Sequence, residues 1–453
     1  MLFRSRARRR VCVVGLDGVP FGLLQRLAGE GVMPRTAAIL RGGGLRKMRA
    51  SLPPVSSVSW SCFMTGANPA EHGIFGFTDV ASDSYQLRFP TFTDLATPTF
   101  WDRLGERGLR SVVINQPATY PAREFPGALV SGFVALQLEK SVWPKEHLPA
   151  LRRMGYQIDV DTAKARENPV GLLDDLEATL SKRREAAVYF WEREEWDYFQ
   201  LAVTGTDRLH HFLWNAVEQR DHAHHARAMR YYAAVDALIG ELWDRFSKAR
   251  SGDREGEGFM LLSDHGFTGV RFDVRLNAWL REKGYLDYVK DDPTSVADIA
   301  PATRAFALDP GRICINVKGR FARGCVDEAE VGALRSEIAE RLRALTYEGQ
   351  SVIRHVFTRE EAFRGPLLDR APDLVAVSQD GFDLKGTTKG NEVFATTHFQ
   401  GMHTWDDAFV WSLLIEQEAS SCPTGLVISD LAGAIEGYLS AGETPALPGL
   451  KGG

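Results

Sequence analysis

The stretch "VCVVGLDG" (residues 11–18) is a short apolar run that ends at an aspartate and a glycine. Runs of this kind are typical of strands buried on both faces of a parallel sheet. Three similar runs follow, and the longer segments between them, at 173–191 and 235–246, repeat apolar residues at helical spacing. This alternation predicts an α/β fold with a mostly parallel central sheet sandwiched by helices. The three later runs are "SVVINQ" (111–116), "YFQLAV" (198–203) and "FMLLS" (259–263).

The pattern becomes less regular after about residue 268. "RICINVKGRF" (312–321) and "DLVAVSQDGF" (373–382) predict strands of a smaller, mixed subdomain, and "HTWDDAFVWSLLIEQ" (403–417) predicts a return to the main body. We therefore expect a subdomain inserted at 268–395 into a core. The core would comprise residues 11–267 and 396–440, with a basic tail at 1–10 and a disordered tail at 441–453.

The composition limits the classes of function. The chain has 453 residues and a formal net charge of −5, so it has no overall positive field to attract nucleic acid. No apolar run reaches the roughly 18 residues of a membrane span. The start, "MLFRSRARRR", is rich in arginine, but the apolar run that follows it is too short for the apolar region of a signal peptide. We therefore expect residues 1–10 to form a solvated tail. The cysteines form no CxxC pair and predict a reduced, cytoplasmic protein: Cys12, Cys62, Cys314, Cys325 and Cys422.

Aspartates follow three of the predicted strands. Asp17 follows the first run, Asp207 closely follows the third, and Asp264 follows the fourth. Ligands of open α/β sheets bind at the carboxyl ends of the strands. One such aspartate is common, because Asp-Gly turns end many strands. Three of them predict a convergent site.

Histidines accompany these aspartates. In "TDRLHHFLW", Asp207 and His211 share a helix face if the segment is helical. His265 directly follows Asp264, and "GMHTWDD" supplies His403. Carboxylates with imidazoles suit zinc, manganese or iron better than calcium or magnesium. Six ligands are enough for two ions, which would clamp the attacking and leaving oxygens of a phosphoryl displacement.

Other readings of these residues remain open. Each acid–histidine piece alone is more often a helix pair or a plain turn than a metal site. The cluster "DHAHHA", which contains His222, His224 and His225, is charged and predicts a solvated helix start. His398 lies five residues before His403 and is a competing ligand candidate.

The stretch "PPVSSVSWSCFMTG" (53–66) crowds four serines after two prolines. The prolines can fix the approach to a helix, which would place Ser56 at or near the N-cap. A helix N-terminus offers backbone N–H groups and partial positive charge to a phosphoryl group. Ser57, Ser59 and Ser61 would point elsewhere and make local hydrogen bonds.

In this order, these segments resemble the alkaline phosphatase superfamily, and most closely its type I phosphodiesterase and nucleotide pyrophosphatase family. The resemblance implies an alkaline phosphatase-like core. It also implies that Asp17, Asp264 and His265 hold one divalent metal ion, and that Asp207, His211 and His403 hold the other. Zn²⁺ is the expected ion, with Mn²⁺ or Fe as alternatives. Ser56 falls on the nucleophile and would also ligate metal.

Some residues depart from the family pattern. The nucleotide pyrophosphatases usually have a threonine nucleophile, and their phosphoryl-contacting asparagine falls here on Ser59. Ser59 is therefore the expected substrate-binding residue, if its hydroxyl takes over the contact of the asparagine. Asp406 and Asp407 stand where a glycine usually continues the closing motif. These departures leave the substrate open, while the metal chemistry is little affected.

The resemblance predicts a two-metal phosphohydrolase that cleaves phosphodiester or nucleotide pyrophosphate bonds through a phosphoseryl intermediate. A phosphomonoesterase or a phosphomutase on the same scaffold is the alternative, and a non-catalytic, metal-dependent phosphate-binding module is an alternative of another class. The expected partner is a small phosphate ester or nucleotide, and the sequence does not indicate an oligomeric state.

Overall fold

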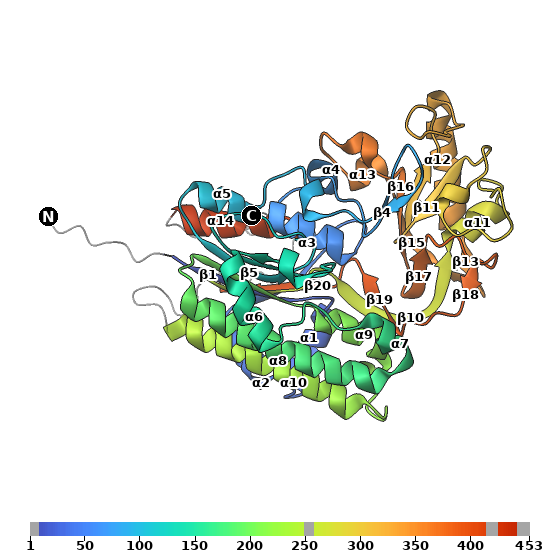
Figure 1. Ribbon diagram of the computed structural model, residues 1–453. Coiled ribbons are helices and arrows are strands. Elements are labelled where there is room, and N and C mark those ends of the chain that lie inside the picture. Colours follow the sequence, from blue (N-terminus) through green and yellow to red (C-terminus); the bar gives the residue numbers. More distant parts are fainter. Residues whose placement is uncertain (1–8, 249–257, 414–424, 442–453) are drawn as a thin grey trace, which may run out of the picture.

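The central sheet of the computed structural model has five parallel strands with antiparallel strands at both edges (Figure 1). The structure describes residues 9–248, 258–413 and 425–441. The four predicted strands are consecutive, parallel neighbours in it, which confirms the predicted α/β class. In sheet order the strands are β2 (Gly44–Met48), β20 (Ala408–Ser412), β9 (Phe259–Leu262), β1 (Val11–Leu16), β8 (Tyr198–Val203), β5 (Ser111–Gln116), β6 (Gly127–Ser131) and β7 (Val142–Trp143).

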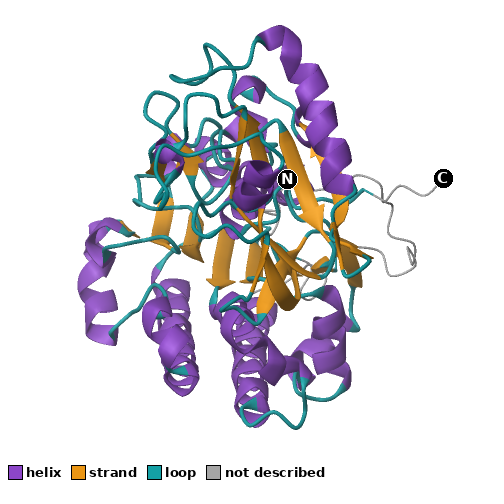
Figure 2. Cartoon of the chain, turned by 90° about the vertical axis from the view of Figure 1, so that its right-hand side faces the viewer, coloured by secondary structure: helices purple, strands orange, loops and turns teal. Residues whose placement is uncertain are grey.

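Helices cover both faces of the sheet, as Figures 1 and 2 show. Alternation along β1 explains the two layers: Cys12 and Val14 belong to one apolar cluster, and Val11 and Val13 to another. The first face carries α1 (Phe21–Gly29), α2 (Pro34–Leu40), α6 (Leu148–Met154), α7 (Thr162–Glu167), α8 (Pro169–Arg193), α9 (Gly205–Glu218) and α10 (His225–Lys248). The second carries α3 (Ser56–Thr65), α5 (Phe100–Glu106) and α14 (Asp430–Ala441).

A second lobe, here called the cap, lies beyond the carboxyl ends of the central strands (Figure 1). It contains one sheet in the order β11-β12-β16-β15 and another in which β10 pairs with β17, β18 and β19. Its elements are β10 (Gly266–Arg275), α11 (Leu276–Glu282), β11 (Ala305–Leu308), β12 (Arg312–Ile315), α12 (Glu328–Arg343), β13 (Thr346–Tyr347), β14 (Gln350–Ser351), β15 (Ile353–Thr358), α13 (Arg359–Ala362), β16 (Leu374–Ser378), β17 (Gly381–Lys385), β18 (Phe394–Ala395) and β19 (Gly401–Thr404).

The cap also gathers a segment from early in the chain. Val80 and Tyr85 belong to the apolar cluster of the cap, although they precede the predicted insertion at 268–395. They come from a short hairpin formed by β3 (Asp79–Val80) and β4 (Leu87–Arg88). The preceding α4 (Pro69–His72) packs with Phe363 and Val375 in a further small cluster. The cap is therefore more than one contiguous insertion.

The predicted tails lie largely outside the described residues, since the structure leaves out 1–8 and 442–453. At the described end of the basic tail, Arg9 lies over the Tyr438 ring and Arg10 over the Trp196 ring, so these two arginines pack on the body and are not simply solvated. None of the helices in the described ranges combines the length and the apolar composition that a bilayer crossing requires.

Candidate active site

Three neighbouring strands bring the predicted aspartates to one edge of the sheet. β1 lies between β9 and β8, and Leu16 is level with Val203. Asp17 directly follows β1, Asp207 lies in the first turn of α9, and Asp264 follows β9. All three are buried. Gly18 adopts a left-handed φ of +66°, which favours glycine, and its N–H donates to Asp264 Oδ1 at 3.1 Å.

The six predicted ligands form two groups. The inner triad consists of Asp17, Asp264 and His265, and the outer triad of Asp207, His211 and His403. Within each triad, one possible ligand atom per residue lies within 4.8 Å of the others. The two triads adjoin, because His265 Nε2 is 4.0 Å from Asp207 Oδ1. The structure thus brings together every residue that was predicted as a metal ligand.

Backbone carbonyls orient the three imidazoles. Nδ1 of His265 contacts the Gly266 carbonyl at 3.0 Å, that of His211 the Gly401 carbonyl at 3.3 Å, and that of His403 the Pro54 carbonyl at 3.0 Å. A carbonyl oxygen can only accept, so Nδ1 is the protonated nitrogen in each contact. Each Nε2 then carries a lone pair that a metal ion held beside the carboxylates could accept. This arrangement is typical of metal-binding histidines.

The two triads differ in their electrostatics. Burial, together with the charges of Asp264 and Asp207, raises the pKa of Asp17 well above its usual range. Burial also raises the pKa of Asp264 to about 7. Although burial acts in the same direction on Asp207, its neighbours His211, His403 and Arg208 hold the pKa of Asp207 well below its usual range. The inner carboxylates therefore lack compensating positive charge.

The residues present fit divalent metal ions. Asp264 Oδ2 is buried and has no hydrogen-bond partner among the described residues, although it lies 3.4 Å from His265 Nε2. An orphaned carboxylate oxygen of this kind is costly unless a cation is bound. Carboxylates combined with imidazole nitrogens are a donor set typical of zinc, manganese or iron.

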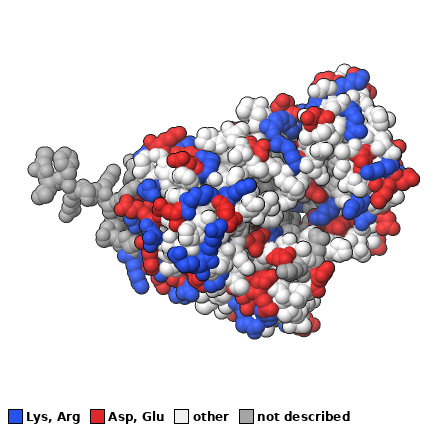
Figure 3. All heavy atoms as spheres, viewed as in Figure 1, with Lys and Arg blue, Asp and Glu red and all other residues white. Residues whose placement is uncertain are grey.

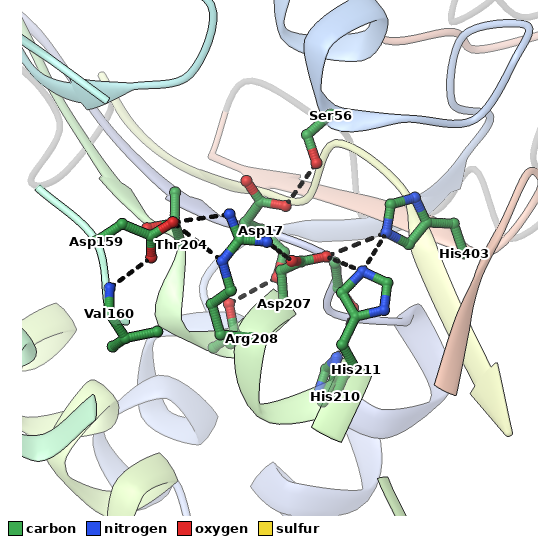
Figure 4. Close-up of polar contacts among 12 residues, drawn as sticks. Asp17, Ser56, Asp159, Val160, Thr204, Asp207, Arg208, His210, His211 and His403 are labelled. Atoms are coloured by element: carbon green, nitrogen blue, oxygen red, sulfur yellow. Dashed lines mark hydrogen bonds and ion pairs between the residues drawn. The ribbon is translucent and has the colours of Figure 1, made fainter. Parts of the chain in front are cut away.

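Ser56 is the first residue of α3 and faces the inner triad (Figure 4). Its hydroxyl donates to Asp17 Oδ1 at 3.2 Å, and its Oγ lies 3.1 Å from His265 Nε2. One turn later, Trp60 Nε1 donates to the other oxygen of Asp17 at 3.0 Å. The predicted helix start and the predicted nucleophile thus lie directly beside the predicted ligands.

The other serines of the stretch face elsewhere. Ser61 Oγ donates to the Ser57 carbonyl at 2.6 Å, as expected for a local hydrogen bond. The Ser57 hydroxyl is buried and makes no such bond within the described ranges. Ser59 is fully buried, and its Oγ lies 2.9 Å from Ser51 Oγ. The structure therefore does not bring Ser59, the residue at the position of the family asparagine, to the two triads.

The remaining histidines lie apart from these groups. His398 is exposed and belongs to neither triad. His225 is the first residue of α10, which agrees with the predicted helix start. A third possible metal group, formed by Glu146, His147 and Glu194, lies outside the cavity lining, and Arg110 is ion-paired to its Glu194.

A cavity of about 490 Å³ opens onto the outer triad between the core and the cap. Ser56, Asp207, His211 and His403 line its floor, whereas the inner triad does not reach its surface. Its walls include the stacked rings of Phe77 and Phe133, Arg208, and the cap residues Arg354, Asp383 and Lys385. Sequence reasoning missed the wall residues and Trp60, because none of them belongs to a ligand pattern.

The sequence matches the family described as type I phosphodiesterase / nucleotide pyrophosphatase over residues 11–406. The chain belongs to this family. Phosphonoacetate hydrolase from Sinorhizobium meliloti 1021, solved with phosphonoformate, superimposes with a TM-score of 0.65 at 17% identity, covering 96% of each chain. Murine ectonucleotide pyrophosphatase / phosphodiesterase 5, solved in an inactive form with AMP, gives a TM-score of 0.54 at 13% identity and covers 95% of this chain and 94% of its own. Among curated proteins, none matches the sequence.

Membership of the type I phosphodiesterase / nucleotide pyrophosphatase family confirms the predicted alkaline phosphatase superfamily and its core fold. It identifies the chain as a phosphohydrolase of the phosphodiesterase and pyrophosphatase type. The superfamily is metal-dependent, which agrees with the donor set of the two triads.

Proposed function

We propose that the protein is a two-metal phosphohydrolase that cleaves phosphodiester or nucleotide pyrophosphate bonds through a phosphoseryl intermediate. One observation carries the proposal. Ser56 Oγ lies 3.2 Å from Asp17 Oδ1 and 3.1 Å from His265 Nε2, at the start of a helix and on the floor of a cavity. A serine with a purely structural role would not need to lie beside buried carboxylates at the start of a helix. A nucleophile that attacks a bound phosphoryl group needs this position.

In the first step of the proposed mechanism, Ser56 Oγ forms a bond to phosphorus while the bond from phosphorus to the leaving oxygen breaks in line. The Ser56 hydroxyl loses its proton, and the leaving oxygen gains one. Water then attacks the phosphoserine, and Ser56 Oγ is released. Divalent ions held by the two triads would supply positive charge that acidifies the serine hydroxyl and stabilises the leaving oxygen.

The chain supports these steps with its own groups. Trp60 and the Ser56 hydroxyl fix the two oxygens of Asp17, so the carboxylate cannot rotate. The N-terminal turn of α3 directs backbone N–H groups and partial positive charge toward the phosphoryl oxygens. The cap closes one side of the cavity and would shape the site of the leaving group.

The substrate is the open part of the proposal. The family description favours a diester or pyrophosphate over a monoester, and a cavity of about 490 Å³ has room for the second substituent. A phosphomonoesterase, a phosphomutase and a non-catalytic phosphate-binding module are the competing functions. Hydrolysis rates of bis-p-nitrophenyl phosphate and p-nitrophenyl phosphate, measured with zinc or manganese, would rank these functions. Phosphonoacetate is a third substrate for the same assay.

An acid-quenched reaction analysed by peptide mass spectrometry tests the intermediate. Phosphate on Ser56 in the wild-type protein, and its loss in Ser56→Ala, would support the proposal. Ser61→Ala is the matched control, because its hydroxyl lies on the same helix but bonds only the Ser57 carbonyl. Phosphate on another serine, or full activity in Ser56→Ala, would favour direct attack by water.

The cysteines support a reducing, cytoplasmic location as part of the proposal. Cys12, Cys62 and Cys314 are free and buried, and Cys325 is free and partly buried. Cys422 lies outside the described residues. Free thiols of this kind are typical of reducing compartments.

A further inference from the structure

Arg208 places a guanidinium group on the wall of the cavity that holds Ser56 and the outer triad. It directly follows the outer ligand Asp207 in α9, and 11% of its side chain is exposed. Burial lowers the pKa of Arg208, but the charges of Asp159 and Asp207 outweigh it and raise that pKa above the ordinary arginine value. A fixed positive charge therefore faces the space that a substrate would enter.

Three contacts hold this guanidinium in one orientation (Figure 4). Nε and Nη2 donate to Asp159 Oδ2 at 3.0 and 2.7 Å, and Nη1 donates to Asp207 Oδ2 at 2.9 Å. The other oxygen of Asp159 accepts from the Val160 N–H at 2.9 Å, so the anchoring carboxylate is itself fixed. The guanidinium also lies over the Phe133 ring, with its carbon 4.1 Å from the ring centroid.

The contacts leave part of the guanidinium available. A guanidinium has five N–H donors, and the two carboxylates take three of them. One N–H on each Nη remains without a protein acceptor in the described part of the chain. Two N–H groups held in a rigid plane match the oxygens of a phosphoryl group.

The family position for a phosphoryl contact does not supply a donor here. Ser59 holds that position, but its hydroxyl is buried against Ser51. Arg208 lines the same cavity as Ser56 and shares Asp207 with the outer triad.

We propose that Arg208 donates to a non-bridging oxygen of the phosphoryl group that Ser56 attacks, in place of the side chain at position 59. Arg208 is then a catalytic residue, because negative charge on these oxygens must be stabilised during transfer. Asp159 is a positioning residue that holds the guanidinium toward the cavity. This inference rests on the proposed function, since it names a contact within the same site.

The competing role for Arg208 is purely structural. Its Nη1 contact could serve only to hold Asp207 in place for a metal ion. The two roles differ in what is lost with the side chain. Loss of a phosphoryl contact weakens phosphate binding and leaves both ions bound, whereas loss of Asp207 positioning removes an ion from the outer triad.

The test compares Arg208→Ala and Arg208→Lys with the wild type in metal-loaded, full-length protein. Metal content is measured by elemental analysis, inorganic phosphate affinity by calorimetry, and kcat and KM with bis-p-nitrophenyl phosphate. We expect Arg208→Ala to keep its metal content, to bind phosphate at least tenfold more weakly, and to lose roughly 10²–10³ in kcat/KM. Arg208→Lys should recover only part of this loss, because lysine keeps the charge but not the planar pair of donors.

Arg354→Ala is the matched control. Arg354 is also a cation on the cavity wall, but Asp406 accepts from both of its Nη atoms. Its loss of phosphate affinity should be clearly smaller than that of Arg208→Ala, because both Nη atoms of Arg354 already have an acceptor. If Arg208→Ala does not fold, Arg208→Gln combined with Asp159→Asn removes the ion pair without leaving an unpaired carboxylate, and should show the same weak phosphate binding.

Two results would overturn the inference. Unchanged phosphate affinity in Arg208→Ala would mean that no contact exists. Loss of about one ion per chain in that variant would reduce Arg208 to a positioning residue for Asp207. The phosphate measurement does not depend on turnover. If the wild type binds phosphate but hydrolyses neither ester, the proposed function fails while the role of Arg208 is still decided.

Discussion

The inner and outer triads use the same residue types in different surroundings. The side chains of Asp264 and His265 are fully buried, whereas 17% of the His211 and His403 side chains is exposed to the cavity. The inner triad has two carboxylates and one imidazole, and its carboxylates accept from N–H and O–H donors of Gly18, Trp60 and Ser56. The outer triad has one carboxylate, two imidazoles and the guanidinium of Arg208.

This difference assigns separate tasks to the two triads. The inner triad gathers negative charge that a bound cation or a proton would relieve, and it contacts the nucleophile. The outer triad is already compensated within the protein, and its surface faces the space for the substrate. We therefore expect changes in the inner triad to affect metal affinity and the attacking oxygen most. Changes in the outer triad should act mainly on phosphoryl and leaving-group binding.

The largest expected effect comes from Asp264→Asn. This change removes a proposed inner ligand whose Oδ2 has no hydrogen-bond partner among the described residues. Changes to residues that hydrogen-bond metal ligands already reduce metal affinity or activity by roughly 10–100-fold. Loss of a ligand itself should reduce metal affinity further and abolish most turnover. Elemental analysis should show about one ion fewer per chain. Full metal content with wild-type activity would break the assignment of the inner triad.

His403→Ala should have the next largest effect. It removes an outer ligand and the Nδ1 contact to the Pro54 carbonyl, two residues before Ser56. We expect weaker binding of one ion and loss of most turnover, with partial recovery at high zinc concentration. His398→Ala is the matched control, because His398 is exposed and outside both triads. A larger loss in His398→Ala than in His403→Ala would reverse the assignment of the closing motif.

Trp60→Phe should have a smaller effect that sharpens the comparison. It keeps an aromatic ring but removes the N–H donor to Asp17 Oδ2. Because this donor acts through a ligand, we expect a decrease of roughly 10–100-fold in metal affinity or kcat. Titration with zinc should locate the loss in one of two sites. An unchanged zinc titration would show that Ser56 and the ion alone orient Asp17.

The smallest expected effect is on how the free energy of unfolding of the metal-free protein depends on pH. Burial raises the pKa of Asp264 to about 7, whereas an unfolded aspartate titrates near about 4. Between these values Asp264 binds more protons in the folded state than in the unfolded state, so its own contribution to the free energy of unfolding should fall as pH rises from about 4 to about 7. Thermal unfolding with a chelator should show that the stability difference between the wild type and Asp264→Asn changes with pH in this sense. Equal slopes in both proteins would contradict the expectation.

Asp207 should behave in the opposite sense. Its folded pKa is held below the usual range, so its contribution to stability is present above about pH 4 and is lost as pH falls through the folded pKa. Asp207→Asn in the same metal-free experiment should therefore remove stability at neutral pH. A gain of stability in this variant would show that the outer triad is not compensated by its neighbours.

The sequence was sufficient to predict the strands and the grouping of the acids and histidines, because both depend on local patterns. β1, β5 and β8 coincide with the predicted runs, and the aspartates follow strands whose ends must meet at one edge. The clustering of the two triads could be predicted because acids and histidines recur at positions that a strand end or one helix turn brings together. No pattern of this kind marks Asp159, which lies 49 residues before its partner Arg208.

The cap and the cavity wall could not be predicted for the same physical reason. Val80 and Tyr85 join the cap through long-range packing, and nothing in their local sequence indicates their partners. The role of Ser59 was expected from alignment with the family alone. In the folded chain its hydroxyl turns toward Ser51, a contact that depends on how the loop before α3 packs.

The pairing of β10 with β19 has a consequence for how the enzyme could be altered. β10 begins directly after His265, and β19 carries His403, which lies opposite Phe267. The same two strands lead out to the cap and back from it, so the chain crosses between lobes at the point where it supplies a histidine to each triad. This junction is a suitable place at which to exchange the cap for that of another protein. Exchange of the segment between Arg275 and Phe394, together with the β3–β4 hairpin that packs with it, would bring new cap residues to the cavity wall and leave the reacting atoms unchanged. Substrate preference could then be changed separately from the chemistry.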